Sequence, residues 1–108
     1  MSRSTKLSTL ASLPYYAVIF ASEKSSQLDG YNQMAERMIE LAQQQEGFLG
    51  IDSASSDIGI TVSYWQSLED IKNWKTNSEH QVARKQGRET WYKGFTLRVA
   101  KVESHYEL

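Results

Sequence analysis

The sequence has no cysteine among its 108 residues. The chain can therefore form no disulfide bond and no thiolate metal site, and it has no cysteine nucleophile. This absence fits a reducing compartment. Histidine is also scarce, because the only two, His80 and His105, lie far apart in the chain. No ligand cluster with recognisable spacing results, so we expect no metal site.

Charge of one sign is not in excess. Twelve Lys and Arg residues oppose 13 Asp and Glu residues, which gives a formal net charge of −1. Nucleic-acid-binding surfaces are strongly basic, so we expect no nucleic-acid partner. No apolar run approaches the roughly 18–20 residues that span a membrane, or the core of a secretory signal. We therefore expect a cytoplasmic protein with no membrane partner.

Motifs for phosphate and cofactor binding are missing as well. The glycines are isolated and form neither a GxGxxG nor a Walker pattern. No serine lies in a GxSxG context. The sequence therefore predicts no nucleotide cofactor, and we expect a protein that works without a cofactor.

The chain is long enough for one domain. Residues 1–14 are rich in Ser and Thr and end at the single proline, Pro14, so we expect a flexible N-terminal arm. Residues 15–108 then form the domain. A core of this size has little room for a ligand cavity inside the domain itself. A ligand pocket would lie between elements or at a subunit interface.

Hydrophobic periodicity and capping residues divide the domain into six segments. Asp29 is the expected N-cap of the first helix, Gly47 its C-terminal cap, and Ser67 the N-cap of the second helix. Apolar runs predict strands, and amphipathic stretches predict helices. The expected elements are strand 15–22, helix 29–45, strands 48–54 and 58–65, helix 67–74 with a second helical stretch from 77 or 78 to 87, and strand 95–106.

The order β-α-β-β-α-β is the ferredoxin-like, split βαβ arrangement of the α+β class. It predicts an antiparallel four-stranded sheet with both helices on one face. The strands are apolar on both sides, so the open face needs a cover. A homodimer that pairs two sheets is the simplest cover.

Three stretches resemble the antibiotic biosynthesis monooxygenase (ABM) domain. Residues 15–20 (YYAVIF), followed by Gly30-Tyr31 and Met34-Ala35, resemble its first β-α unit. Residues 45–50 (QEGFLG) resemble its turn into the second strand, and residues 64–71 (YWQSLEDI) followed by Trp74 resemble the passage into its second helix. The resemblance covers roughly residues 15–106. It implies a dimeric α/β barrel.

The resemblance leaves the chemistry open. The family includes cofactor-free monooxygenases of aromatic polyketides, haem-degrading enzymes, and many members with no known activity. The haem-degrading branch has a Trp on the second helix, a His about ten residues later and an Asn on the first strand. Trp74 matches, but Arg84 stands where the His would be and residues 15–20 contain no Asn. Haem degradation by that mechanism is therefore disfavoured.

His80 is the candidate catalytic residue, because a histidine can act as general base near neutral pH. A cofactor-free oxygenase needs such a base to ionise an enol or phenol. The alternative is a surface histidine near a helix N-terminus. We expect the other histidine, His105, to lie at the surface.

Five further residues are candidates for substrate binding. Three tryptophans could line a pocket for a flat molecule, or could form the core. An arginine could bind a carboxylate or an oxyanion, or could cap a helix. A tyrosine could donate a hydrogen bond to a quinone-like oxygen, or could pack at an interface. These residues are Trp65, Trp74, Trp91, Arg84 and Tyr64.

Three functions remain open. The chain could be a cofactor-independent monooxygenase, or a related isomerase, that acts on a small aromatic or quinone-like molecule. It could instead bind such a molecule without turning it over. It could also be an interaction protein whose function is the dimer itself. A space between helices and sheet that reaches His80 would favour the enzyme.

Overall fold

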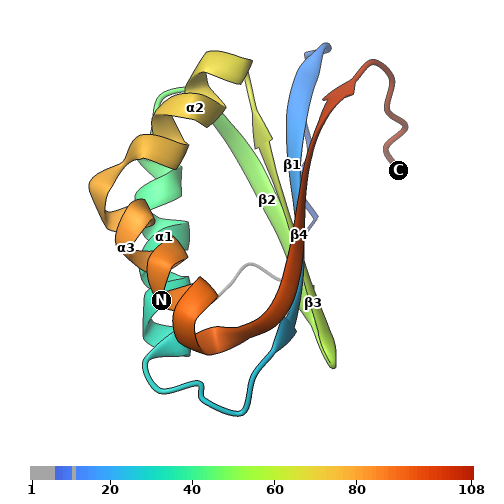
Figure 1. The fold of residues 1–108 in the computed structure, drawn as a ribbon. Helices are drawn as coiled ribbons and strands as arrows, with labels where there is room; N and C mark the ends of the chain where they lie inside the picture. Colours follow the sequence, from blue (N-terminus) through green and yellow to red (C-terminus); the bar gives the residue numbers. More distant parts are fainter. Residues whose placement is uncertain (1–6, 11) are drawn as a thin grey trace.

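The computed structural model describes residues 7–10 and 12–108. Figure 1 shows two layers, with the helices on one side of a twisted sheet. The elements in chain order are β1 (Tyr15–Lys24), α1 (Tyr31–Gln43), β2 (Phe48–Ser55), β3 (Ile58–Trp65), α2 (Leu68–Thr76), α3 (Ser78–Gln86), a π-helical turn η1 (Gly87–Trp91) and β4 (Tyr92–Val102). The strand order is β2-β3-β1-β4, and all neighbouring strands are antiparallel. The predicted ferredoxin-like α+β fold is confirmed.

Strand register assigns each side chain to one face of the sheet. Trp65 of β3 pairs with Tyr16 of β1, and the Trp65 ring stacks on Trp74 of α2. This set of alternate residues therefore faces the helices. The residues between them face away from the helices. Tyr64, which precedes Trp65, is one of these, and its ring packs edge-on against Tyr15.

The cap of α2 is the one that the sequence predicts, and α3, whose predicted start is residue 77 or 78, is capped by Asn77. The hydroxyl of Ser67 accepts a hydrogen bond from the backbone N–H of Asp70 at 3.1 Å. The side chain of Asn77 accepts one from the backbone N–H of His80 at 3.2 Å. Gly47, after α1, has the expected left-handed conformation with φ 83°.

The predicted N-cap of α1 is wrong. The helix begins after Gly30, which has φ 78°, and no side chain caps it. A tight turn precedes the helix, because the N–H of Tyr31 donates to the carbonyl of Leu28 at 2.9 Å. Glycine enters this left-handed turn at no steric cost, whereas Asp29 lies one residue too early to cap the helix.

The last strand is also displaced from its predicted bounds of 95–106. It begins at Tyr92 because η1 leads directly into it, and it ends at Val102, where its partner Tyr15 begins β1. A strand needs a neighbour for its backbone hydrogen bonds. His105 follows the strand and is half-buried rather than superficial, with Nδ1 2.9 Å from the hydroxyl of Tyr15.

The predicted arm, residues 1–14, lies partly outside the described residues, which omit 1–6 and 11. Its described part contacts β2. The N–H of Ser8 donates to Asp52 at 2.8 Å, and the Ser8 hydroxyl exchanges hydrogen bonds with the backbone of Ile51. The flexibility of the arm stays a prediction. In the described ranges, no helix is long and apolar enough to cross a membrane.

Candidate functional site

A stack of three rings joins the core to α3. Trp65 is fully buried, and its indole N–H donates to the hydroxyl of Ser63 at 2.9 Å. Trp74 lies above it with ring centroids 6.0 Å apart. The ring of His80 stacks on Trp74 at 4.2 Å, with only 14° between the ring planes. The core therefore provides a rigid base for His80.

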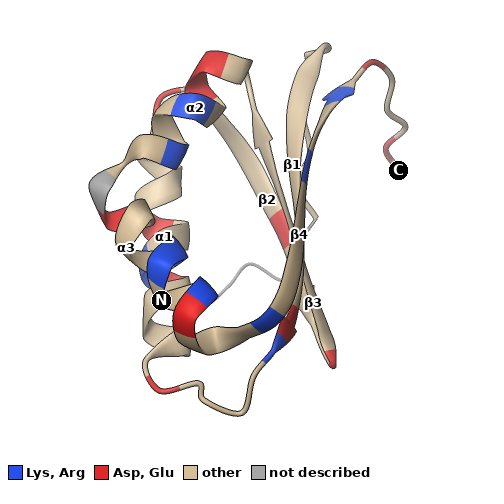
Figure 2. Ribbon diagram, in the orientation of Figure 1, with Lys and Arg blue, Asp and Glu red and all other residues tan. Residues whose placement is uncertain are grey.

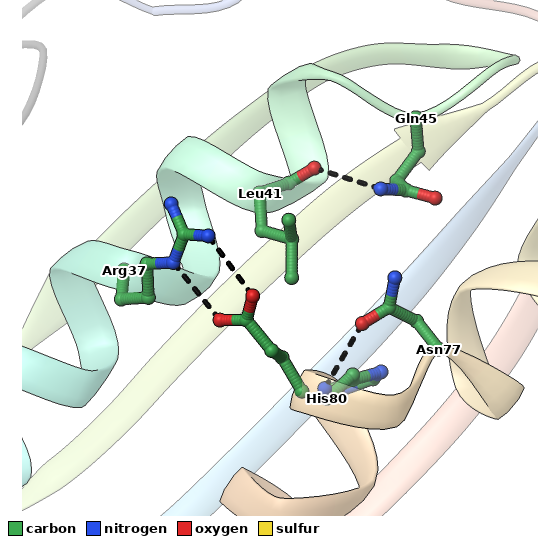
Figure 3. A network of polar contacts seen from close by, with 6 residues as sticks. Arg37, Leu41, Gln45, Asn77 and His80 are labelled. Carbon is green, nitrogen blue, oxygen red and sulfur yellow. Dashed lines mark hydrogen bonds and ion pairs between the residues drawn. The ribbon is translucent and has the colours of Figure 1, made fainter.

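The break between α2 and α3 places His80 in this stack. Asn77 ends α2 and caps α3, so the chain turns and brings the first turn of α3 back over Trp74. Figure 3 shows Asn77 and His80 there, opposite Arg37 and Leu41 of α1. Arg37 holds this turn against α1, because its guanidinium donates two hydrogen bonds to the carboxylate of Glu79, each 2.9 Å long.

The two ring nitrogens of His80 have different roles. Nδ1 lies 2.9 Å from the carbonyl oxygen of Trp74. A carbonyl only accepts hydrogen bonds, so Nδ1 carries the proton and Nε2 holds the free lone pair. No buried side-chain nitrogen or oxygen of the described residues lacks a partner. Since Nε2 makes no hydrogen bond with the described residues, it is at least partly exposed to solvent.

Burial lowers the pKa of His80 below its ordinary value of 6.5, and the positive charge of Arg84 lowers it further. The hydrogen bond to Trp74 opposes both effects and does not overcome them. Burial and a nearby cation both disfavour an imidazolium. His80 is therefore neutral at pH 7 and has the protonation state of a general base.

Arg84 belongs to a surface pocket that is lined by residues of α3 and η1. The pocket has a volume of about 350 Å³. Three of its residues are basic and one is acidic, and Figure 2 shows these charges along α3 and η1. We call the three basic residues, Arg84, Lys85 and Arg88, the cationic rim. The full lining is Gln81, Arg84, Lys85, Arg88 and Glu89.

Beside the cationic rim, the helix-facing side of β4 is apolar and uncovered. Phe95, Leu97 and Val99 pair with Ser22, Phe20 and Val18 of β1 on the face that carries Trp65. Their exposed fractions are nevertheless 41%, 54% and 47%. We call these three residues the β4 trough. The guanidinium of Arg88 lies 5.9 Å from the ring of Phe95, so the rim and the trough adjoin.

Two predicted ligand residues lie elsewhere. Trp91 is 5% exposed, donates its indole N–H to the carbonyl of Asp29 at 3.0 Å, and packs edge-on against Tyr31 in a separate aromatic cluster. Tyr64 lies on the far face of the sheet and donates to the carboxylate of Asp52 at 2.9 Å. Burial, followed by this hydrogen bond and the charge of Asp52, raises the pKa of Tyr64 to about 12.

The structure thus divides the predicted site. It brings Trp65, Trp74, His80 and Arg84 together and keeps Trp91 and Tyr64 apart from them. The β4 trough is an addition that our sequence reasoning missed. Its signal was present, because Phe95, Leu97 and Val99 alternate with Thr96 and Arg98.

A metal-dependent site finds no support in the part of the chain that the structure describes. No group of three or more His, Asp or Glu side chains there could hold a metal ion. Two of the acidic side chains bond other groups: the carboxylate of Asp52 accepts a hydrogen bond from Tyr64, and that of Glu79 accepts from Arg37.

The protein is thus a ferredoxin-like α+β domain that holds a histidine stacked on a core tryptophan. Residues 14–86 match the sequence model of the antibiotic biosynthesis monooxygenase family, and the chain belongs to that family. It is 51% identical over 92 residues to the uncharacterized protein YqjZ of Bacillus subtilis (strain 168), an alignment that covers 83% of this chain and 81% of YqjZ.

Solved structures share the fold at low sequence identity. Rv0793 from Mycobacterium tuberculosis superimposes with a TM-score of 0.76 at 14% identity, covering 88% of this chain and all (100%) of that one. A structure described as an antibiotic biosynthesis monooxygenase gives a TM-score of 0.70 at 10% identity, covering 84% of this chain and 99% of that one. These likenesses establish the fold alone.

Proposed function

We propose that this protein is a cofactor-independent monooxygenase of a small aromatic or quinone-like molecule, with His80 as the general base. The observation that supports this role most directly is the hydrogen bonding of the two ring nitrogens of His80. The Trp74 carbonyl fixes the proton on Nδ1, and Nε2 makes no hydrogen bond with the residues that the structure describes. Membership of the monooxygenase family supports the reaction class.

The reaction needs a substrate that supplies its own electrons. Nε2 of His80 accepts the proton of a phenol or enol, and the resulting anion transfers an electron to O₂. Radical recombination forms a C–O bond, and the resulting peroxide anion takes the proton back from Nε2 of His80. Loss of water from the peroxide leaves a new carbonyl, so that one oxygen atom enters the quinone and the other leaves as water. The balance is a phenol plus O₂ giving a quinone plus H₂O.

Arg84 assists this step electrostatically. Its guanidinium lies close enough to His80 to lower the pKa of the imidazole. The same charge would stabilise the phenolate or enolate that forms when the proton moves to Nε2. In this proposal Trp74 orients His80 by stacking on its ring, while Trp65 supports Trp74 from within the core.

We further propose a cytoplasmic homodimer. The sheet face opposite the helices carries Ile58 and Ile60, which are 56% and 46% exposed. Tyr64 and Ala17 continue that face toward its buried end. An apolar face of this kind favours a partner, and the family resemblance implies one that pairs two sheets.

Oxygen uptake by the purified full-length chain tests the enzyme. An anthrone, or a naphthol that carries a conjugated carbonyl group, is offered in air, and its quinone is followed by absorbance. We expect one O₂ consumed per quinone, with one labelled oxygen in the product when ¹⁸O₂ is used. His80→Ala should lower kcat by about 10²–10⁴-fold, the usual contribution of a general base.

Lys72→Gln provides the matched control, because Lys72 is an exposed residue of the neighbouring helix α2 that does not line the pocket. Unchanged quinone formation in His80→Ala would refute the proposed base. Saturable binding of the phenols with no oxygen uptake would instead support the non-catalytic binding protein.

A further inference from the structure

The β4 trough is an apolar surface that the fold leaves open on the side of the helices. Phe95, Leu97 and Val99 lie on one face of an edge strand, each between 41% and 54% exposed. Phe20, from the adjacent β1, packs against Phe95 with ring centroids 5.5 Å apart and continues the surface inward. A flat ring laid on this surface would bury apolar area on one side.

The cationic rim adjoins the trough. Arg88 lies over the ring of Phe95 at 5.9 Å. Arg84 precedes it by one helical turn, and His80 precedes Arg84 by another, so the three lie along neighbouring positions of one side of the helix. The pocket of about 350 Å³ contains three basic side chains and one carboxylate, from Glu89. Its volume is in the range of small-molecule sites.

We propose that this cleft binds a flat aromatic acid, with its ring on the β4 trough and its anionic group on Arg84 and Arg88. Planar guanidinium groups recognise carboxylates and sulfonates through paired N–H donors. An inorganic anion alone would leave the trough bare, and a neutral aromatic would give the cationic rim no anionic partner; in the protein itself, Arg84 donates only to the carbonyl of Lys75 at 3.5 Å among its described hydrogen bonds. Only a ligand that has both parts satisfies both surfaces.

This inference rests on the proposed function, because that function requires a phenolic substrate. It adds that the phenol belongs to the class of aromatic acids. The substrate carries an acid group beside the ring that is oxidised. The acid anchors the molecule at the rim, while its ionisable hydroxyl extends toward Nε2 of His80. His80 lies about one helical turn from Arg84 and two from Arg88.

Two fluorescent probes test the charge requirement directly. 8-Anilinonaphthalene-1-sulfonate carries an anionic group, and N-phenyl-1-naphthylamine is the same ring system without it. Ordinary apolar sites favour the neutral probe, because a sulfonate is costly to desolvate. We expect the reverse here: the sulfonate should bind about tenfold more tightly than the neutral probe, or better, because one charge-assisted contact contributes that much affinity. Both affinities are measured on the full-length wild-type chain.

Three variants locate the binding. Arg84→Gln with Arg88→Gln should lower the affinity for the sulfonate by about tenfold or more and leave the neutral probe unchanged. Leu97→Ser should weaken both probes, since it removes apolar surface from the trough. Lys72→Gln removes a positive charge outside the pocket and should alter neither. The ratio of the two affinities is read on one sample, so partial unfolding of a variant does not imitate the result.

A wild-type preference for the neutral probe would overturn the proposal. A sulfonate affinity that survives the double substitution would also overturn it. A double variant that changes only in its oligomeric state would overturn it too, and would assign the surface to a second copy of the chain. If the charge preference is found but no phenol is oxidised, the monooxygenase fails and the aromatic-acid site stands.

Discussion

Replacement of Trp65 by Phe should test whether this residue supports the site or touches the ligand. Trp65 is fully buried and donates its indole N–H to Ser63. Phe keeps part of the stack with Trp74 but removes that hydrogen bond, which is worth about 1 kcal/mol. The missing ring volume costs about 1–2 kcal/mol more. The free energy of unfolding should fall by about 2–3 kcal/mol.

Urea unfolding followed by far-ultraviolet circular dichroism measures this loss without relying on tryptophan fluorescence. Protein concentration is held fixed, because a dimer has a concentration-dependent stability. For a chain of 108 residues, the midpoint of thermal unfolding should fall by about 10–15 °C. Substrate KM and probe affinity, measured well below that midpoint, should change little.

A double-mutant cycle with Ser63→Ala isolates the hydrogen bond. Ser63→Ala alone leaves the buried indole N–H without a partner and should cost about 1–2 kcal/mol. In the Trp65→Phe background the same change should cost much less, since the donor is gone. A stability loss below about 1 kcal/mol in Trp65→Phe, together with a several-fold rise in KM, would refute the supporting role and return Trp65 to the ligand site.

Two further perturbations have clear signs. Gly47→Ala should destabilise the fold by about 2–3 kcal/mol in urea unfolding, because φ is +83° and the new Cβ would lie 2.0 Å from Oδ2 of Asp70. Gly94→Ala, whose Cβ meets nothing closer than 3.9 Å, should be nearly neutral. The lowered pKa of His80 means that the unfolded chain binds the proton more tightly, so stability should rise as pH increases from the folded-state pKa to about 6.5. His80→Gln should remove this slope, and a slope that persists would contradict it.

The fold was largely predictable because its signals are local. Ser67 and Asn77 cap α2 and α3 as their residue types favour, and alternating apolar residues mark the strands. The start of α1 was missed because Asp29 and Gly30 both suit a helix entrance, and only the turn from Leu28 decides between them. Such a turn depends on how the chain leaves β1, which the sequence alone does not show.

The candidate site was less predictable, because it depends on which way side chains point. Tyr64 and Trp65 are adjacent in one strand, so strict alternation already assigns them to opposite faces; a single pocket holding both was inconsistent with the predicted strand itself. His80 is different. Its position over Trp74 follows from the angle between two helices at Asn77, which no periodicity in the sequence reveals.

The bonding of His80 also limits what it can deprotonate. Its Nδ1 bonds a main-chain carbonyl, and no carboxylate among the described residues bonds the ring to stabilise an imidazolium. Arg84 disfavours that cation further. A base whose pKa lies below 6.5 accepts protons efficiently only from acidic groups. The proposed substrate must therefore carry an acidified hydroxyl, such as a phenol conjugated to a carbonyl, which is the electronic character of a quinone-like ring.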